Sequence, residues 1–269
     1  MCKKFVLASD LQRIETRFNA RLDPSTPKIP KLYAVSGGED SYVITSQDPH
    51  LIQVLNFGMN PFFAVEPLNL INARAEGDKN SNNNPLYNGS KAIFLQRAFR
   101  KPIQSQRCIV IADAYYEWSD KDKPYLVYLQ NKIRPFSFAG LYDKWQNPHS
   151  EEVVHSFAII TTISNPLLQS LGATRMPVIL SKSNETHWIK ASNHLADVLR
   201  LLVPYPFEKM NAYPVSDSVN LPKVNDPCMV NPIGKKIREE INPTTPVNHR
   251  FQKEKPPPDK LWFEGHSKA

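Results

Sequence analysis

The chain carries a cysteine directly after its initiator methionine, in the sequence MCKKF. A small residue at position 2 allows Met1 to be removed, and Cys2 would then present an α-amine and a thiol on one residue. These groups titrate not far above neutral pH, with ordinary pKa values of about 8 and about 8.5. The alternative is an incidental residue in a poorly ordered chain end. Cys2 is therefore a candidate nucleophile.

Polar residues within strand-like runs form a second group of candidates, because a buried polar side chain is either paired or functional. In LINARAE (70–76), Asn72, Arg74 and Glu76 alternate with small or apolar residues, so a strand would place all three on one face. The alternative is a solvent-facing strand edge with a local Arg–Glu pair.

Two further stretches carry charged side chains beside apolar strands. In IVIADAYYEW (109–118), Glu117 stands between two aromatic residues, where burial would raise its pKa and make it a general acid near neutral pH. An exposed glutamate on a hairpin is the alternative. In RMPVIL (175–180), Arg175 either grips a phosphate or caps a structural carboxylate.

Composition and charge set broad limits on the class of protein. The 269 residues are 41% hydrophobic and 22% charged, which is ordinary for a globular protein. We see no membrane-spanning run and no secretory signal, so we expect an intracellular protein, cytoplasmic if bacterial. Three widely spaced cysteines give neither a disulfide framework nor a zinc pattern, and we expect no cofactor or metal. The net charge of +7 permits a polyanionic partner.

Short strands with irregularly placed helices must position these candidates. Runs rich in β-branched and aromatic residues alternate with turn-forming residues, which favours an α+β fold over a doubly wound α/β sheet. We predict one domain over residues 1–241 and a Pro-rich C-terminal tail over 242–269. The predicted helices cover residues 9–20 (capped by Ser9), 90–100 (ended by Pro102), 184–202 and 231–241.

Taken in order, the motifs resemble one family. The sequences MC, NARAE, ADAYYEW and RMPVIL, followed by YPVS (213–216), are similar to those of the SRAP family. Its members are known as SOS response-associated peptidases and as sensors of abasic sites in single-stranded DNA. The resemblance implies a single α+β domain in which a barrel-like, mixed or antiparallel sheet system is flanked by helices.

The resemblance also implies a covalent reaction. Once Met1 has been removed by the protein itself, Cys2 would be the nucleophile. Its amine and thiol would close a thiazolidine ring with the aldehyde of an opened abasic sugar. Asn72 matches the residue that orients the amine and the sugar, and Glu117 matches the residue that moves protons during ring opening.

The implied partner is single-stranded DNA with abasic sites, held by backbone contacts and base stacking, and a monomer is favoured. Arg74 and Arg175 match arginines that hold phosphates. Lys4 stands where the family has arginine, so it keeps the charge but loses the bidentate fork. Phe62 and Phe63 stand in a stretch that is tryptophan-rich in the family, and they are candidates for stacking on bases.

One departure bears on catalysis. The family places a histidine two residues before the arginine of RMP, and this chain has Ala173 there. A positioned acid or base contributes about a hundred- to ten-thousand-fold in rate, so we expect slower crosslink formation or reversal. His155 is the nearest histidine in sequence. Two other functions stay open: a cysteine-type peptidase acting on other proteins, and a degenerate module that only binds single-stranded DNA.

Overall fold

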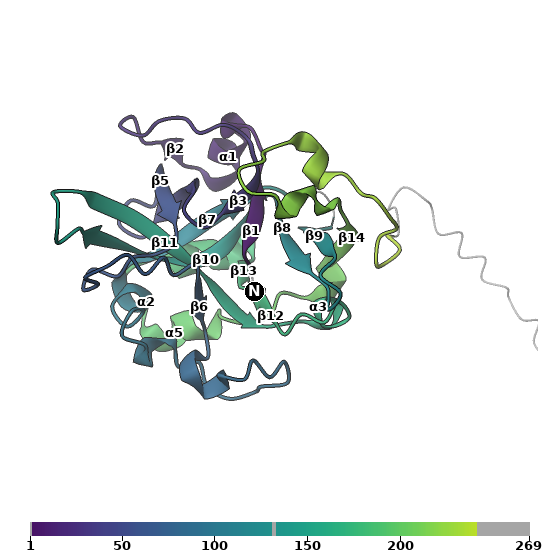
Figure 1. Cartoon of the computed structure of the whole chain (residues 1–269). Helices are drawn as coiled ribbons and strands as arrows, with labels where there is room; N and C mark the ends of the chain where they lie inside the picture. Colours follow the sequence, from purple (N-terminus) through teal and green to yellow (C-terminus); the bar gives the residue numbers. More distant parts are fainter. Residues whose placement is uncertain (1, 131–132, 241–269) are drawn as a thin grey trace, which may run out of the picture. The chain divides into compact units, whose positions relative to one another are not determined.

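Five strands close into a barrel in the computed structural model, which describes residues 2–130 and 133–240. Strands β11, β10, β7, β4 and β5 pair antiparallel in that order, and a parallel pairing between β5 and β11 completes the ring (Figure 1). The barrel strands are β4 (Asp40–Thr45), β5 (Leu51–Phe57), β7 (Arg107–Ala112), β10 (Phe136–Gln146) and β11 (Val153–Ile163). Shorter strands extend this sheet: β2 (Arg21–Leu22), β6 (Asn72–Arg74), β12 (Arg175–Pro177) and β13 (Ile179–Leu180).

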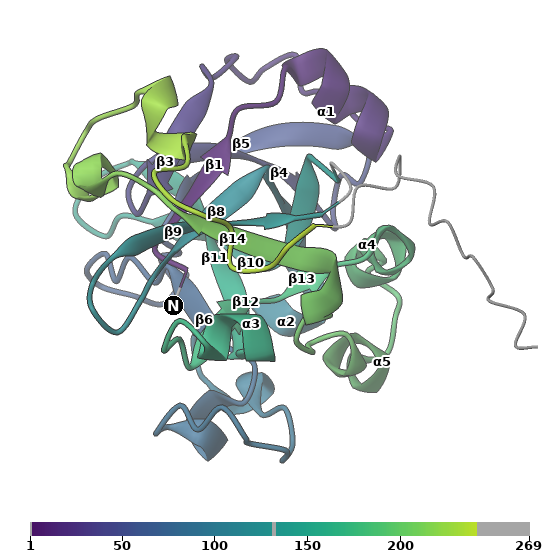
Figure 2. The same ribbon diagram turned by 90° about the vertical axis from the view of Figure 1, so that its right-hand side faces the viewer.

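A second, antiparallel sheet packs against the barrel and contains the first strand of the chain. Its order is β14–β9–β8–β1–β3, so β1 lies between β8 and β3 (Figure 2). The ring of Phe5 on β1 contacts Phe57 and Phe138 of the barrel, at centroid distances of 5.5 and 6.0 Å. The strands are β1 (Lys4–Leu7), β3 (Leu32–Ser36), β8 (Ala114–Trp118), β9 (Pro124–Leu129) and β14 (Met210–Pro214). The predicted barrel-like α+β fold is confirmed.

A buried carboxylate fixes where β1 ends. Asp113, in the tight connection between β7 and β8, accepts hydrogen bonds from the backbone N–H groups of Ala8 and Ser9, each at 2.7 Å. The hydroxyl of Ser9 donates to the same carboxylate at 2.5 Å, and the N–H of Asp113 donates to the carbonyl of Val6 at 2.7 Å. These bonds hold β1 in one register along β8, which in turn fixes the position of the residues before β1.

The helices agree with the sequence in part. Helix α1 (Leu11–Phe18) lies within the predicted range, but Asp10 takes the N-cap position because the hydroxyl of Ser9 is bonded to Asp113. Helices α4 (Lys182–Ile189) and α5 (Leu195–Arg200) confirm the prediction for 184–202.

Two predicted helices are wrong. Residues 90–100 hold only a short 3-10 turn, Ile93–Leu95, and Pro102 begins helix α2 (Pro102–Ser105) instead of ending a helix. Proline suits the first turn because the backbone N–H that it lacks has no partner there. Residues 231–240 form bends and irregular backbone without a helix. Helix α3 (Pro166–Gln169), which we did not predict, is capped by the side chain of Asn165.

The domain boundary stays a prediction. Residues 1–238 form one unit, separate from 239–269. Met1 and the predicted tail, residues 242–269, lie outside the described residues.

Candidate active site

Cys2 is fully buried at the start of β1, where a side chain from the barrel holds it. The amide Nδ2 of Asn72 donates a hydrogen bond to the carbonyl oxygen of Cys2 at 2.9 Å. Asn72 begins β6, which pairs in parallel with β11 so that Asn72 lies opposite Ile159. The other amide atom, Oδ1, is buried and has no hydrogen-bond partner among the described residues. Asn72 is therefore anchored by its strand, with one polar atom still available to a ligand.

Glu117 reaches the same place from β8. The pairing of β1 with β8 sets Phe5 opposite Tyr115, and continuing this antiparallel register brings Glu117 beside Lys3. Glu117 is 4% exposed, and burial raises the pKa of its carboxyl although the hydrogen bond from the Trp118 backbone N–H and, less strongly, the charge of Lys3 oppose the shift. Burial, and then the charge of Glu117, raise the pKa of the Cys2 thiol. The resting thiol is neutral, and Glu117 keeps a proton more readily than an exposed carboxyl does.

The structure thus brings together the three residues that the sequence singled out for catalysis. In the comparison with known proteins, the family model for SOS response associated peptidase (SRAP) matches residues 1–222. The chain belongs to the SRAP family.

Named relatives and a solved structure resemble the chain over most of its length. It is 33% identical to the abasic site processing protein YoqW of Bacillus subtilis, over 86% of this chain and 99% of YoqW. It is 29% identical to the abasic site processing protein HMCES of Xenopus tropicalis, over 52% of this chain and 46% of HMCES. A crystal structure of a Bacteroides thetaiotaomicron protein superposes with a TM-score of 0.74 and 28% identity, covering 86% and 99% of the two chains.

Ala173, for which the resemblance implies a histidine in the family, follows a loop that is bonded to the residues beyond β8. The backbone N–H of Asp120, just beyond β8, donates to the carbonyl of Leu171 at 3.0 Å. Ala173 is 9% exposed, and its own carbonyl accepts from the hydroxyl of Ser164 at 2.7 Å. Its methyl group cannot transfer a proton.

His155 does not lie in this part of the molecule. It pairs with Lys144 in the hairpin of β10 and β11, four residues along β11 from the position opposite Asn72. Four strand residues span roughly 13 Å. His155 therefore cannot take the place of the missing histidine without a large rearrangement.

Arg175 is engaged in a buried ion pair. It is 1% exposed, and its Nη2 donates to the carboxylate of Glu76 at 2.7 Å and to the carbonyl of Thr161 at 2.8 Å. Lys91 donates to the other oxygen of Glu76 at 2.8 Å. Arg175 therefore caps a structural carboxylate, which is the alternative to phosphate binding that the sequence offers. Its Nη1 is buried without a hydrogen-bond partner among the described residues, so a phosphate contact by Arg175 could use only that nitrogen.

The other two predicted phosphate contacts differ in how free they are. Arg74 ends β6, is half-buried, and makes no hydrogen bond or ion pair within the described residues. Lys4 donates its Nζ to the carbonyl of Val219 at 2.6 Å, and burial lowers the pKa of its ammonium group. Arg74 is therefore the freer cation near Asn72.

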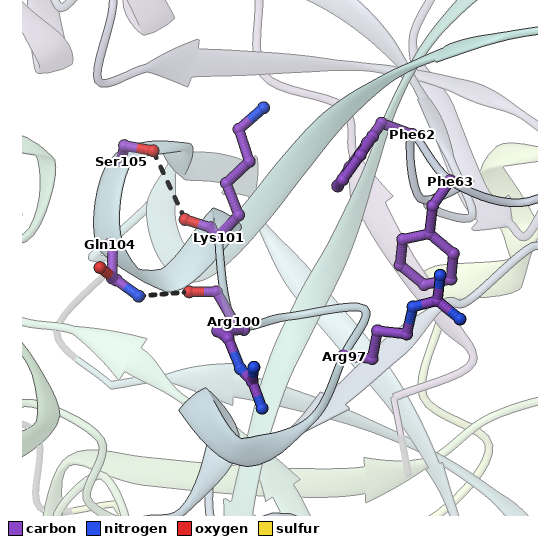
Figure 3. A pocket seen from close by; sticks show the side chains of 7 residues that line it. All are labelled: Phe62, Phe63, Arg97, Arg100, Lys101, Gln104 and Ser105. Carbon is purple, nitrogen blue, oxygen red and sulfur yellow. Dashed lines mark hydrogen bonds between the residues drawn. The ribbon is translucent and has the colours of Figure 1, made fainter.

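Phe62 and Phe63 line a surface pocket of about 570 Å³ (Figure 3). Their rings meet edge to face at 5.5 Å, and Phe62 is 54% exposed. The guanidinium of Arg97 lies 4.0 Å from the ring centre of Phe63, and the ammonium of Lys101 lies 4.9 Å from that of Phe62. The lining residues are Phe62, Phe63, Arg97, Arg100, Lys101, Gln104 and Ser105.

Every charged residue lining this pocket is positive, and we call it the aromatic–basic pocket. The sequence pattern singles out the two aromatic residues of this pocket but not its cations. The available signal was the close spacing of Arg97, Arg100 and Lys101 in QRAFRK.

Over the described residues, no helix has the length and apolar character that crossing a membrane requires. We also find no metal-binding cluster in this part of the chain: no group of three or more histidine, cysteine, aspartate or glutamate side chains could hold a metal ion.

The ion pair of Arg175 predicts how stability depends on pH. Burial alone would raise the pKa of Glu76, but Lys91 and Arg175 lower it from 4.5 to about 2. Because the folded-state pKa lies below the unfolded one, the stabilisation is complete above about pH 5 and is lost as the pH falls toward 2. Urea unfolding between pH 7 and pH 3 should show Glu76→Gln less stable by about 3–5 kcal/mol at pH 7, because two buried cations lose their partner.

The difference between Glu76→Gln and the unmodified protein should shrink at the acid end. Glu151→Gln is the control, since Glu151 is exposed and makes no ion pair within the described residues, so its substitution should leave the pH profile unchanged. A constant difference across the whole range would show that the charge of Glu76 is not what stabilises the fold.

Proposed function

We propose that this protein captures abasic sites in single-stranded DNA covalently, through Cys2 after self-removal of Met1. The observation that carries the proposal is the hydrogen bond from Asn72 to a fully buried Cys2, beside the buried carboxyl of Glu117. The printed names of YoqW and HMCES, both abasic site processing proteins, support the choice of substrate.

The proposed reaction has two stages. The α-amine of Cys2 attacks C1 of the opened sugar, a C–N bond forms, and the carbonyl oxygen leaves as water to give an imine. The thiol sulfur then adds to the imine carbon, a C–S bond forms, and the thiol proton moves to nitrogen. Amine, thiol and aldehyde thus give one thiazolidine and one water, with no oxidant or reductant.

The geometry assigns a part to each neighbour. Asn72 holds the carbonyl of Cys2, which orients that residue, and its free Oδ1 can accept a hydrogen bond from the amine. Glu117, with its raised pKa, donates the proton that ring opening and loss of water require. A neutral thiol suits the second stage, because the nitrogen receives its proton. Holding amine and aldehyde together supplies much of the acceleration.

Ala173 fits slower chemistry rather than lost chemistry, because condensation of an aminothiol with an aldehyde needs no catalyst once the groups are held together. A peptidase acting on other proteins is less well supported. No hydrogen bond joins Cys2 to a histidine within the described residues, so the usual activation of a cysteine nucleophile is not provided there.

Substitution of Cys2 tests the covalent step. Cys2→Ala should abolish the denaturation-resistant adduct with abasic single-stranded DNA while leaving binding to intact single strands within about twofold, because only the thiol is lost. Gel analysis of the denatured products measures the adduct. Cys228→Ala is the matched control: that thiol is exposed and should not matter. Adduct formation by Cys2→Ala at the normal level would exclude the mechanism, and no adduct from the unmodified protein would favour a module that only binds DNA.

The aromatic–basic pocket supplies noncovalent contacts in this proposal. An exposed ring beside cations is what single-strand binding without sequence preference uses: the ring stacks on a base and the cations contact phosphates. Arg74, near Asn72, contacts a phosphate close to the lesion. We propose that Phe62, Phe63, Arg97 and Lys101 bind the strand away from the lesion.

Two substitutions separate stacking from charge in this pocket. Phe62→Ala should weaken binding of intact single-stranded DNA by about 1–3 kcal/mol with an unchanged salt dependence, since stacking is uncharged. Arg97→Ala should weaken binding and reduce the slope of log K against log salt by about 0.7, the contribution of one phosphate contact. Fluorescence anisotropy at several salt concentrations measures both.

Arg200→Ala is the control for the loss of one positive charge, because Arg200 is exposed and pairs with Asp197. If Arg97→Ala and Arg200→Ala change the slope equally, the pocket has no specific part in binding.

A further inference from the structure

Tyr115 carries a buried hydroxyl group with no hydrogen-bond partner among the described residues. Its side chain is fully buried, and its ring packs edge-on against Phe138 at 5.8 Å. Burying a hydroxyl without a partner is unfavourable, so such a group in a folded protein needs an explanation.

The neighbouring tyrosine shows the ordinary arrangement. Tyr116 is also buried, but its hydroxyl donates to the carbonyl oxygen of Tyr33 at 2.7 Å. Successive strand residues point to opposite faces, so Tyr115 lies on the face of β8 that carries Glu117, and Tyr116 lies on the other. The hydroxyl of Tyr116 thus makes a hydrogen bond within the fold, whereas the hydroxyl of Tyr115 lies on the side of the sheet that holds the candidate site.

Tyr115 lies two residues from Glu117 on one face of β8, and electrostatics agree with this placement. Burial raises its pKa well above the ordinary value, and the charges of Glu117 and Cys2 raise it further. These two are the residues that the proposed reaction uses. At neutral pH the hydroxyl therefore keeps its proton, so it acts as a hydrogen-bond donor and not as a base.

We propose that Tyr115 is a further catalytic residue, whose hydroxyl donates a hydrogen bond to the oxygen on C1 of the abasic sugar. The inference rests on the function proposed above. When the amine of Cys2 attacks C1, the C=O electron pair moves to this oxygen, which takes a proton from Glu117. The nitrogen then gives its proton to Glu117, which passes it to the same oxygen, and the oxygen departs as water. The imine nitrogen returns its remaining proton to Glu117. Tyr115 is not consumed. It stabilises the negative charge that develops on the oxygen, as preorganised donors do in other acyl and carbonyl reactions.

This contact also suits the absence of a histidine. The side chain of Ala173 supplies no polar atom to the site, whereas Asn72, Glu117 and Tyr115 each carry one. Asn72 already holds the backbone of Cys2. The unpaired hydroxyl of Tyr115 is therefore a donor still free to reach the sugar oxygen.

Removal of the hydroxyl alone tests the proposal, with Tyr116→Phe as the matched control. Each protein is mixed in excess with abasic single-stranded DNA, made by removing uracil from an oligonucleotide, and the adduct is followed over time. Loss of one such donor commonly reduces a rate by about a hundredfold or more, so Tyr115→Phe should slow adduct formation by at least about tenfold. Tyr116→Phe should form adduct at the normal rate.

Thermal stability should change in the opposite pattern. Tyr115→Phe removes a buried unpaired group, so its melting temperature should equal or exceed that of the unmodified protein. Tyr116→Phe loses the bond to the Tyr33 carbonyl, so it should melt at a lower temperature. A strand with a tetrahydrofuran in place of the abasic sugar lacks the hydroxyl group on C1. Binding to this strand should be unchanged in both variants.

The outcomes separate the two proposals. Normal adduct kinetics in Tyr115→Phe, with Cys2-dependent adduct from the unmodified protein, would overturn the part assigned to Tyr115 alone. Tyr115→Phe could instead form adduct slowly, melt at a lower temperature and bind the tetrahydrofuran strand less tightly. That result would show that Tyr115 stabilises the fold, and it would also overturn the catalytic role. No adduct from the unmodified protein would overturn the proposed function and, with it, this inference.

Discussion

The arrangement depends on keeping the second residue of the chain buried in a fixed place. Chain ends ordinarily fray, because few contacts offset their conformational entropy. Here β1 is paired on both sides, by β3 and β8, and its far end is fixed by the Asp113 carboxylate. At its near end, Asn72 binds the carbonyl of Cys2. Asn72 comes from β6, which extends the barrel sheet, and the second sheet supplies β1, so the site forms where the two sheets meet.

Burial then determines what the polar groups of the site can do. Removal from water raises the pKa values of Cys2, Glu117 and Tyr115, so all three hold protons more firmly than exposed groups do. The opposite case is Glu76, which stays ionised because Lys91 and Arg175 surround it. The molecule thus holds proton-bearing groups beside the candidate nucleophile and a fully charged cluster around Glu76.

Local sequence pattern singles out two of the residues that the structure places beside Cys2, and their catalytic roles stay proposals. Asn72 and Glu117 stand out as polar residues in apolar strands, and that property requires no knowledge of distant neighbours. Arg175 was ambiguous because its partner, Glu76, is 99 positions away in sequence, and the strand pattern does not reveal which side chains meet across β11. The same limit explains Ser9, whose distant bond to Asp113 displaced the helix cap. The sequence does not reveal the tertiary contacts between side chains, nor does it give the order of the strands.

The central claim is that the reaction product forms on Cys2 with its α-amine free to react. Mass spectrometry of the N-terminal peptide, after reaction with abasic single-stranded DNA and nuclease digestion, tests this most directly. The account predicts a peptide that begins at Cys2, without Met1, and carries the deoxyribose fragment on that residue. Its mass should equal that of the peptide plus the fragment minus one water. A peptide that retains Met1, or a fragment attached to a lysine side chain instead, would contradict the account.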